Sequence, residues 1–220
     1  TTRLTHATPA AVYAHSPHRD WEADGDLTEE AKQNGCKDIA RQLIEFPFGG
    51  GLDLALGGGR SNFTPAEKAD PEYPDRNGRR RDGRDLVAEL EAKSSAHVAI
   101  WNREQFEAID PAANPRVLGL FEMSHMQYEL DREADAAGEP SLAEMTAKAI
   151  DILSRNRNGY FLMVEGGRID HAHHGGNAAR ALHDTVAYAD AVDIARAMTN
   201  ERDTLIIVTA DHGHTMALQG

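Results

Sequence analysis

The stretch Tyr160–His214 decides the fold of this chain. It begins with the apolar run YFLMV (Tyr160–Val164), continues through a long helical pattern at Asn177–Met198, and ends with the apolar run LIIV (Leu205–Val208). Each short apolar run predicts a buried strand, and the pattern between them predicts a connecting helix. Because strand–helix–strand order is typical of parallel strands, the stretch predicts an α/β fold with a mostly parallel central sheet flanked by helices.

The same alternation is expected upstream of this stretch. Strands are predicted at Leu52–Leu56, His97–Ile100 and Val117–Phe121, and helices at Thr28–Ile44, Asp85–Ala92, Arg103–Ala108 and Ser141–Ser154. Thr28 is a predicted N-cap, and Ser141 with Glu144 forms a capping-box pattern. Residues 1–26 show little periodicity and predict irregular structure. Two polar segments, 61–84 and 122–140, are expected as surface excursions from one domain that covers residues 1–220.

Composition excludes several classes of protein. The 220 residues are 40% hydrophobic, which is enough for a core, and 23 basic against 36 acidic residues leave a net charge of −13. This acidity argues against nucleic-acid binding, and the chain has no apolar run of about 18 residues that would span a membrane. Cys36 is a single cysteine and cannot close a disulfide within the chain. Thr1 stands where Met is expected and no leader follows, so we expect a processed amino terminus.

Ligand-type side chains follow both late strands. EGGRIDHAHH (Glu165–His174) comes after the first and TADHGH (Thr209–His214) after the second. Asp170 and His174 are four residues apart, so one helical turn would place both on one face, and carboxylate oxygen with imidazole nitrogen suits zinc. Asp211 and His212 are adjacent, which suits metal binding where a chain turns away from a strand. Since carboxyl ends of parallel strands share a sheet edge, we expect the two clusters to converge on divalent cations.

Other residues are less informative by themselves. His171, His173 and His214, each taken alone, are expected to be surface or hydrogen-bonded histidines. Arg19 could be a solvated surface arginine or a planar fork for phosphate. The run Gly57–Gly59 is interpreted as a turn, because no lysine and no P-loop spacing follow it.

Several motifs in order along the chain resemble one known family. They are TTRLTHATPAAVY (Thr1–Tyr13), Arg19–Trp21, NGCKDIARQL (Asn34–Leu43), LGGGR (Leu56–Arg60), PEYP (Pro71–Pro74), VLGLFE (Val117–Glu122), EGGRIDHAHH and TADHGH. With them the chain resembles the alkaline phosphatases, especially the form found in animals and some marine bacteria. The last two motifs are the most specific to that family.

The resemblance implies a role for individual residues. Asp170 and His174 are similar to ligands of a first zinc, and Asp211 and His212 to ligands of a second. By the same comparison, Glu165 and Thr8 bind magnesium and Arg19 binds two phosphate oxygens. The resemblance also implies three histidines that lie near metals without binding them: His6 near the magnesium, His214 near the second zinc, and His171. A calcium site is also implied, formed by Glu72, the carbonyl of Phe121, Glu122 and Glu139, with Glu139 in place of the family's aspartate.

The departures from the family pattern are as informative as the matches. The family's nucleophilic serine lies in an Asp-Ser-Ala/Gly context that is absent from this sequence. In the family that serine, one bridging aspartate and one zinc-binding histidine lie outside the part that matches here. We therefore expect this chain to be the central portion of the family sequence, lacking its N- and C-terminal segments. Cys36 matches a family cysteine whose disulfide partner would lie upstream.

The resemblance implies a metal-dependent enzyme that hydrolyses phosphate monoesters through a phosphoserine and releases inorganic phosphate. It also implies zinc, magnesium and calcium as cofactors, a homodimer, and a periplasmic or secreted location. A catalytically inactive metal-binding fragment is the alternative, because the nucleophile is absent. A related phosphodiesterase or sulfatase is less favoured, since the arginine and the magnesium positions match the phosphatases.

Overall fold

The computed structural model describes residues 1–215, and the chain divides into two compact units. Thr2–Met126 forms what we call the sheet unit, and Thr1 with the chain from Gln127 onward forms the helical unit. The prediction of one domain over residues 1–220 stays a prediction.

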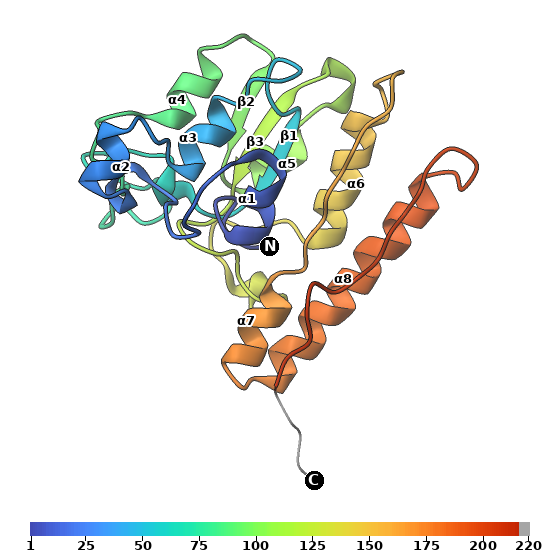
Figure 1. Ribbon diagram of the computed structural model, residues 1–220. Helices are drawn as coiled ribbons and strands as arrows, with labels where there is room; N and C mark the ends of the chain where they lie inside the picture. Colours follow the sequence, from blue (N-terminus) through green and yellow to red (C-terminus); the bar gives the residue numbers. More distant parts are fainter. Residues whose placement is uncertain (216–220) are drawn as a thin grey trace. The chain divides into compact units, whose positions relative to one another are not determined.

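A three-stranded parallel sheet is the centre of the sheet unit (Figure 1). Its strands are β1 (Leu54–Gly57), β2 (His97–Ile100) and β3 (Arg116–Leu120), in the spatial order β1-β3-β2. Both neighbours of β3 run parallel to it. The predicted α/β fold with a parallel sheet flanked by helices is thus confirmed.

Short helices flank this sheet. They are α1 (Ala7–Tyr13), α2 (Glu29–Gln33), α3 (Ile39–Ile44), α4 (Leu86–Glu91) and α5 (Arg103–Ala108), with single 3₁₀ turns at Asp24–Asp26, Arg60–Asn62 and Pro111–Ala113. Helix α3 packs against α1 and α4, and α4 packs against β2. The apolar core of the unit is formed by side chains from α1, α3, α4, β3 and the segments between them: Leu4, Ala10, Tyr13, Ile39, Ala40, Leu43, Ile44, Phe63, Leu86, Leu90, Leu118 and Leu120.

Three predictions for the sheet unit need correction. The single helix expected over Thr28–Ile44 is two helices, and the irregular structure expected over residues 1–26 contains α1. Pro9 lies in the first turn of α1, where a missing N–H has no helical partner to lose. The segment 61–84, expected at the surface, contains three fully buried side chains, Asn62, Phe63 and Arg80. Burial of Arg80 is possible because Asp38 and Asp82 bind its guanidinium.

The helical unit consists of α6 (Leu142–Leu153), α7 (Arg168–His174) and α8 (Ala178–Met198), with a 3₁₀ turn at Arg132–Ala134. Helix α8 packs against both α6 and α7. The predicted capping box is confirmed, since Glu144 N–H donates to Ser141 Oγ at 3.2 Å and Ser141 N–H donates to Glu144 Oε2 at 2.7 Å. Among residues 1–215, none of the helices has the length and apolarity that crossing a membrane requires.

Two predicted strands are absent. Tyr160–Val164 and Leu205–Val208 have no strand structure, and Phe161, Leu205 and Ile207 are 79%, 83% and 75% exposed. An apolar run becomes a strand only when a neighbouring strand accepts and donates its backbone hydrogen bonds. In the part of the chain that the structure describes, no strand pairs with either run. Leu205–Val208 is therefore an exposed apolar run, whereas in Tyr160–Val164 only Phe161 is exposed and the other four side chains are half-buried.

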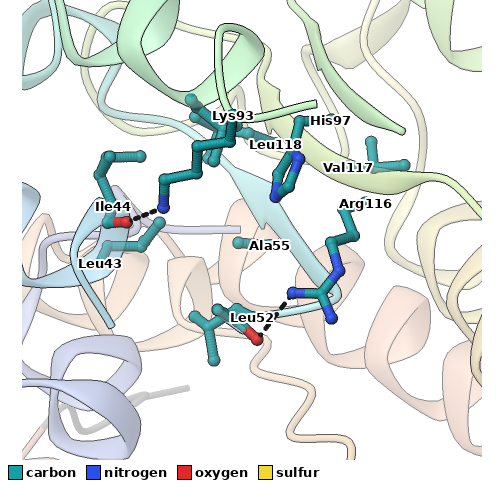
Figure 2. A pocket seen from close by; sticks show the side chains of 11 residues that line it. Leu43, Ile44, Leu52, Ala55, Lys93, His97, Arg116, Val117 and Leu118 are labelled. Carbon is teal, nitrogen blue, oxygen red and sulfur yellow. Dashed lines mark hydrogen bonds between the residues drawn. The ribbon is translucent and has the colours of Figure 1, made fainter. Parts of the chain in front are cut away.

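A pocket lies at the amino-terminal ends of the strands (Figure 2). Catalytic residues of a parallel sheet are instead expected beyond the carboxyl ends of its strands. Its cations have structural partners: Lys93 Nζ donates to the carbonyl of Ile44 at the end of α3, and Arg116 donates to the Gly50 carbonyl at 2.6 Å. Burial, together with the charges of Arg116 and Lys93, lowers the pKa of His97. We interpret this pocket as part of the packing around α3.

Candidate metal and phosphate sites

Helix α7 presents the first predicted metal pair on one face. Asp170 lies in its first turn and His174 in its last, four residues apart, and His174 Nε2 is 3.5 Å from Asp170 Oδ2. This order also suits the helix dipole, because the carboxylate is near the positive amino end and the imidazole near the carboxyl end. The local sequence alone is enough to produce this pair.

His214 joins this pair from the segment that follows α8. Its Nε2 is 3.9 Å from Asp170 Oδ1, and its ring centre lies 4.7 Å from that of His174. One donor atom from each of the three residues lies within 4.8 Å of the others. The resemblance implied that His214 lies close to the second zinc, whereas the structure places it beside the first pair.

The donor set of this cluster fits a zinc ion. It offers one carboxylate and two imidazoles, which are the oxygen and nitrogen ligands that zinc prefers. Asp170 Oδ1 and His214 Nδ1 are buried and have no hydrogen-bond partner among residues 1–215. Buried polar atoms normally have a partner, so these atoms are consistent with a bound cation.

The second predicted pair, Asp211 and His212, lies outside the three-residue cluster. The two side chains are 72% and 57% exposed, and His212 Nε2 is 3.4 Å from Asp211 Oδ2. The contact of His212 with the Gly213 carbonyl raises the pKa of this imidazole, and the charges of Asp211 and Asp170 raise it further. The pair is thus within electrostatic reach of Asp170, and its role as a second zinc site stays a prediction.

Arg168 and His171 add a cation and an imidazole beside the Asp170 cluster. Arg168 lies over the Tyr128 ring, with Cζ 3.7 Å from the ring centre, and its Nη1 is 2.9 Å from His171 Nδ1. Burial lowers the pKa of the Arg168 guanidinium. Cation–π contact with Tyr128 favours the charged form in this half-buried position. Sequence reasoning did not single out Arg168 or Tyr128.

The predicted phosphate arginine, Arg19, is exposed in the sheet unit. Its Nη2 is 3.4 Å from Nε2 of His6, the residue immediately before α1. Thr8, in the first turn of α1, is also exposed. Glu165, its predicted partner in magnesium binding, is in the helical unit. The magnesium assignment therefore stays a prediction.

His125 lies beside His6, and the sequence analysis did not single it out. It follows β3, and its ring is perpendicular to that of His6, with centres 5.2 Å apart and an interplanar angle of 80°. Its position just beyond the carboxyl end of a parallel strand is the signal that could have identified it. The segment 122–140 was instead interpreted as a polar excursion.

The predicted calcium ligands already have partners within the protein. Arg60 Nη2 donates to Glu72 Oε2 at 2.8 Å, and Tyr73 Oη donates to Glu122 Oε1 at 2.7 Å. Phe121 is buried in the sheet unit, whereas the buried Glu139 belongs to the helical unit and accepts from Gln127 N–H at 2.9 Å. A cation at Glu72 would share that carboxylate with Arg60, and the calcium site stays a prediction.

Comparison with known proteins supports the family that the sequence motifs indicate. The family model for alkaline phosphatase matches residues 1–220. The tissue-nonspecific alkaline phosphatase of Gallus gallus is 48% identical over 227 residues, which cover 100% of this chain and 43% of that protein. The alkaline phosphatase of Gadus morhua is 43% identical over 226 residues, with 100% of this chain and 46% of that protein covered.

Solved structures give the same result. The alkaline phosphatase of Thermus thermophilus has a TM-score of 0.70 and 33% identity, over 92% of this chain and 35% of that one. The cold-active alkaline phosphatase of Shewanella sp. has a TM-score of 0.63 and 27% identity, over 90% and 38%. The chain spans less than half the length of these relatives. On this evidence it is a member of the alkaline phosphatase family.

Proposed function

We propose that the protein containing this chain hydrolyses phosphate monoesters and releases inorganic phosphate. The observation that carries the proposal is the family match over all 220 residues, together with the cluster of Asp170, His174 and His214 within 4.8 Å. The chain has a net charge of −13, so a phosphate site needs a local concentration of cations.

Three kinds of cation are part of this proposal. Asp170 with His174 would hold one zinc and Asp211 with His212 a second, while Glu165 and Thr8 would bind magnesium. Glu72, Glu122, Glu139 and the Phe121 carbonyl would bind calcium. When bound at the reacting phosphate, zinc and magnesium supply Lewis-acid catalysis and neutralise developing negative charge.

The role proposed for Arg19 is to bind the substrate phosphate. A guanidinium presents paired N–H donors that match two phosphate oxygens, and it keeps its charge at alkaline pH. Such donors stabilise the charge that builds on the non-bridging oxygens in the transition state. The nucleophile in this proposal is a serine in an Asp-Ser-Ala/Gly context, which forms the phosphoserine and is not among these 220 residues.

The homodimer and the periplasmic or secreted location belong to the same proposal. Both rest on the family resemblance. A catalytically inactive metal-binding fragment is the second candidate for the 220-residue chain by itself, and the absence of the serine context favours it. Assay of that polypeptide alone separates the two, since turnover would contradict the assignment of the nucleophile.

The test of the phosphate arginine is Arg19→Ala in the protein expressed from its complete gene. We expect kcat/KM for an aryl phosphate to fall about 100-fold, because a charged donor to the transition state is lost. Arg196→Ala is the matched control, since Arg196 is an exposed arginine on α8 paired with Asp193. Unchanged kcat/KM in Arg19→Ala would contradict the proposed role.

A further inference from the structure

A chain of side-chain contacts in the sheet unit leads from a buried carboxylate to Arg19. It starts at Glu22, which is 7% exposed and binds Arg3 through two contacts, Nε to Oε2 at 2.8 Å and Nη2 to Oε1 at 2.6 Å. Thr5 Oγ1 and Asn62 Nδ2 donate to the same carboxylate. A bidentate pair with two further donors holds the Arg3 guanidinium in one orientation.

Arg3 in turn holds the ring of His125. Its backbone N–H lies 3.2 Å from His125 Nδ1, and its Nη1 lies 2.8 Å from His125 Nε2. Both Arg3 groups are donors and a neutral imidazole has one acceptor nitrogen, so His125 accepts a hydrogen bond from Arg3 at one ring nitrogen, and the other contact is a close polar approach. Arg3 is therefore the group that sets the orientation of this imidazole.

The backbone around this contact is also held in place. Leu4 N–H donates to the Gly58 carbonyl and Gly58 N–H to the Thr2 carbonyl, at 3.0 and 2.9 Å. A Cβ on Gly58 would lie 2.1 Å from the carbonyl oxygen of Ser124, so only glycine permits this approach. The loop carrying His125 thus packs directly on the end of β1 and on the segment carrying Arg3.

The last contacts reach the phosphate arginine. The edge-to-face contact of His125 with His6 restricts the His6 ring, because aromatic pairs favour this geometry. His6 Nε2 is then 3.4 Å from Arg19 Nη2. An exposed arginine samples many rotamers, and each contact that limits them reduces the entropy lost when phosphate binds.

We propose that His125 is a positioning residue for phosphate binding, which holds His6, and through it the Arg19 guanidinium, in the orientation that receives the phosphate. The inference rests on the proposed function of Arg19. His125 touches neither Arg19 nor substrate in this scheme, so its effect passes entirely through His6. A purely structural role for His125 would change stability without a selective change in phosphate affinity.

The experiment compares His125→Ala and His125→Gln in the protein expressed from its complete gene, each with and without Arg19→Ala. Gln keeps an acceptor for Arg3 but lacks the ring that contacts His6. His97→Ala is the matched control, because His97 lies at the opposite end of the sheet. The measurements are kcat and KM for an aryl phosphate and the competitive Ki of inorganic phosphate.

We expect both His125 variants to raise KM and Ki about three- to tenfold, with less than about a twofold change in kcat. His97→Ala should leave Ki unchanged, and neither His125 variant should raise Ki further when Arg19 is already alanine. If His125→Ala is not recovered folded, His125→Gln carries the same comparison.

Two results would overturn the inference while leaving the proposed function intact. One is an unchanged Ki in the His125 variants although Arg19→Ala raises it. The other is an equal rise with and without Arg19, which would mean that His125 acts independently of it. An Arg19→Ala variant with unchanged Ki would instead refute the proposed phosphate site, and the positioning role of His125 would be refuted as well.

Discussion

Buried carboxylates in this protein differ in how their charge is compensated. Burial alone would raise the pKa of Asp70, but hydrogen bonds and charge from Arg60 outweigh it and lower that pKa. Asp184 is the contrasting case in the helical unit: it is 5% exposed, and burial raises its pKa to about 6. The hydrogen bond from Glu129 N–H to Asp184 Oδ2, at 3.2 Å, offsets burial only in part.

Asp184→Asn should therefore stabilise the protein, and more so at higher pH. The folded-state pKa of about 6 lies above the unfolded value of 3.8, so the folded state binds the extra proton between these values. The free energy of unfolding falls as pH rises through this window, and the loss persists above it. Asparagine does not ionise, so we expect its advantage to grow from pH 4 to 6 and to stay on the order of 2 kcal/mol above that range.

The measurement is the difference in unfolding free energy or apparent Tm between variant and wild type at pH 4, 5, 6 and 8. Asp193→Asn on the same helix is the control, because the Asp193 side chain is 75% exposed. A difference that is constant across this pH range would contradict the raised pKa of Asp184.

At the scale of elements, the break between α2 and α3 shows how side chains end and begin helices. Gly35 adopts φ +75° after α2, and Asp38 begins α3 by accepting from Arg41 N–H at 2.8 Å. The same carboxylate binds the fully buried Arg80 at 3.0 and 3.1 Å. One residue therefore caps a helix and neutralises a buried cation.

Asp38→Ala should destabilise the protein far more than removal of an ordinary cap. It removes the N-cap of α3 and leaves the Arg80 charge with less compensation, so we expect a loss of about 3–5 kcal/mol. Thr28→Ala is the matched control: Thr28 Oγ1 caps α2 by accepting from Ala31 N–H, and its loss should cost about 1 kcal/mol. Urea unfolding followed by circular dichroism measures both, and equal losses would refute the double role of Asp38.

On the scale of the whole molecule, the helical unit exposes many large apolar side chains. They are Phe161, Leu182, Val186, Leu205, Ile207 and Val208. Exposed apolar side chains favour association with other apolar surfaces. These side chains should therefore affect whether the 220-residue polypeptide remains monomeric.

We expect the 220-residue polypeptide by itself to self-associate. Light scattering after gel filtration should give a mass well above 24.0 kDa, with strong binding of a hydrophobic dye. The double variant Leu205→Lys with Ile207→Lys should reduce both signals, because it places charges on an exposed apolar run. A 24.0 kDa monomer that melts in one sharp transition would contradict this expectation.

Metal removal tests the proposed sites in the protein expressed from its complete gene. Chelation should abolish hydrolysis and lower the apparent Tm by several degrees, because the carboxylates and imidazoles would lose the cations that bind them. Zinc with magnesium should restore both, and His174→Ala should retain less zinc by elemental analysis. His183→Ala is the control, since His183 is an exposed histidine on α8. Activity that survives complete chelation would refute the metal-dependent mechanism.

Local sequence determined much of the fold and part of the site. The helix Arg103–Ala108 and the Ser141–Glu144 capping box depend on neighbouring residues, and the structure contains both as predicted. Asp170 and His174 share a helical face for the same reason, because a spacing of four residues sets their geometry.

Only the tertiary structure decided the remaining features, because they depend on groups far apart in the chain. The apolar runs at Tyr160–Val164 and Leu205–Val208 have strand composition but lack a pairing strand among residues 1–215. Likewise, His125 meets Arg3 and His6 although more than 115 residues separate them. Periodicity and capping are encoded by adjacent residues, whereas strand pairing and contacts between distant side chains exist only once the chain has folded.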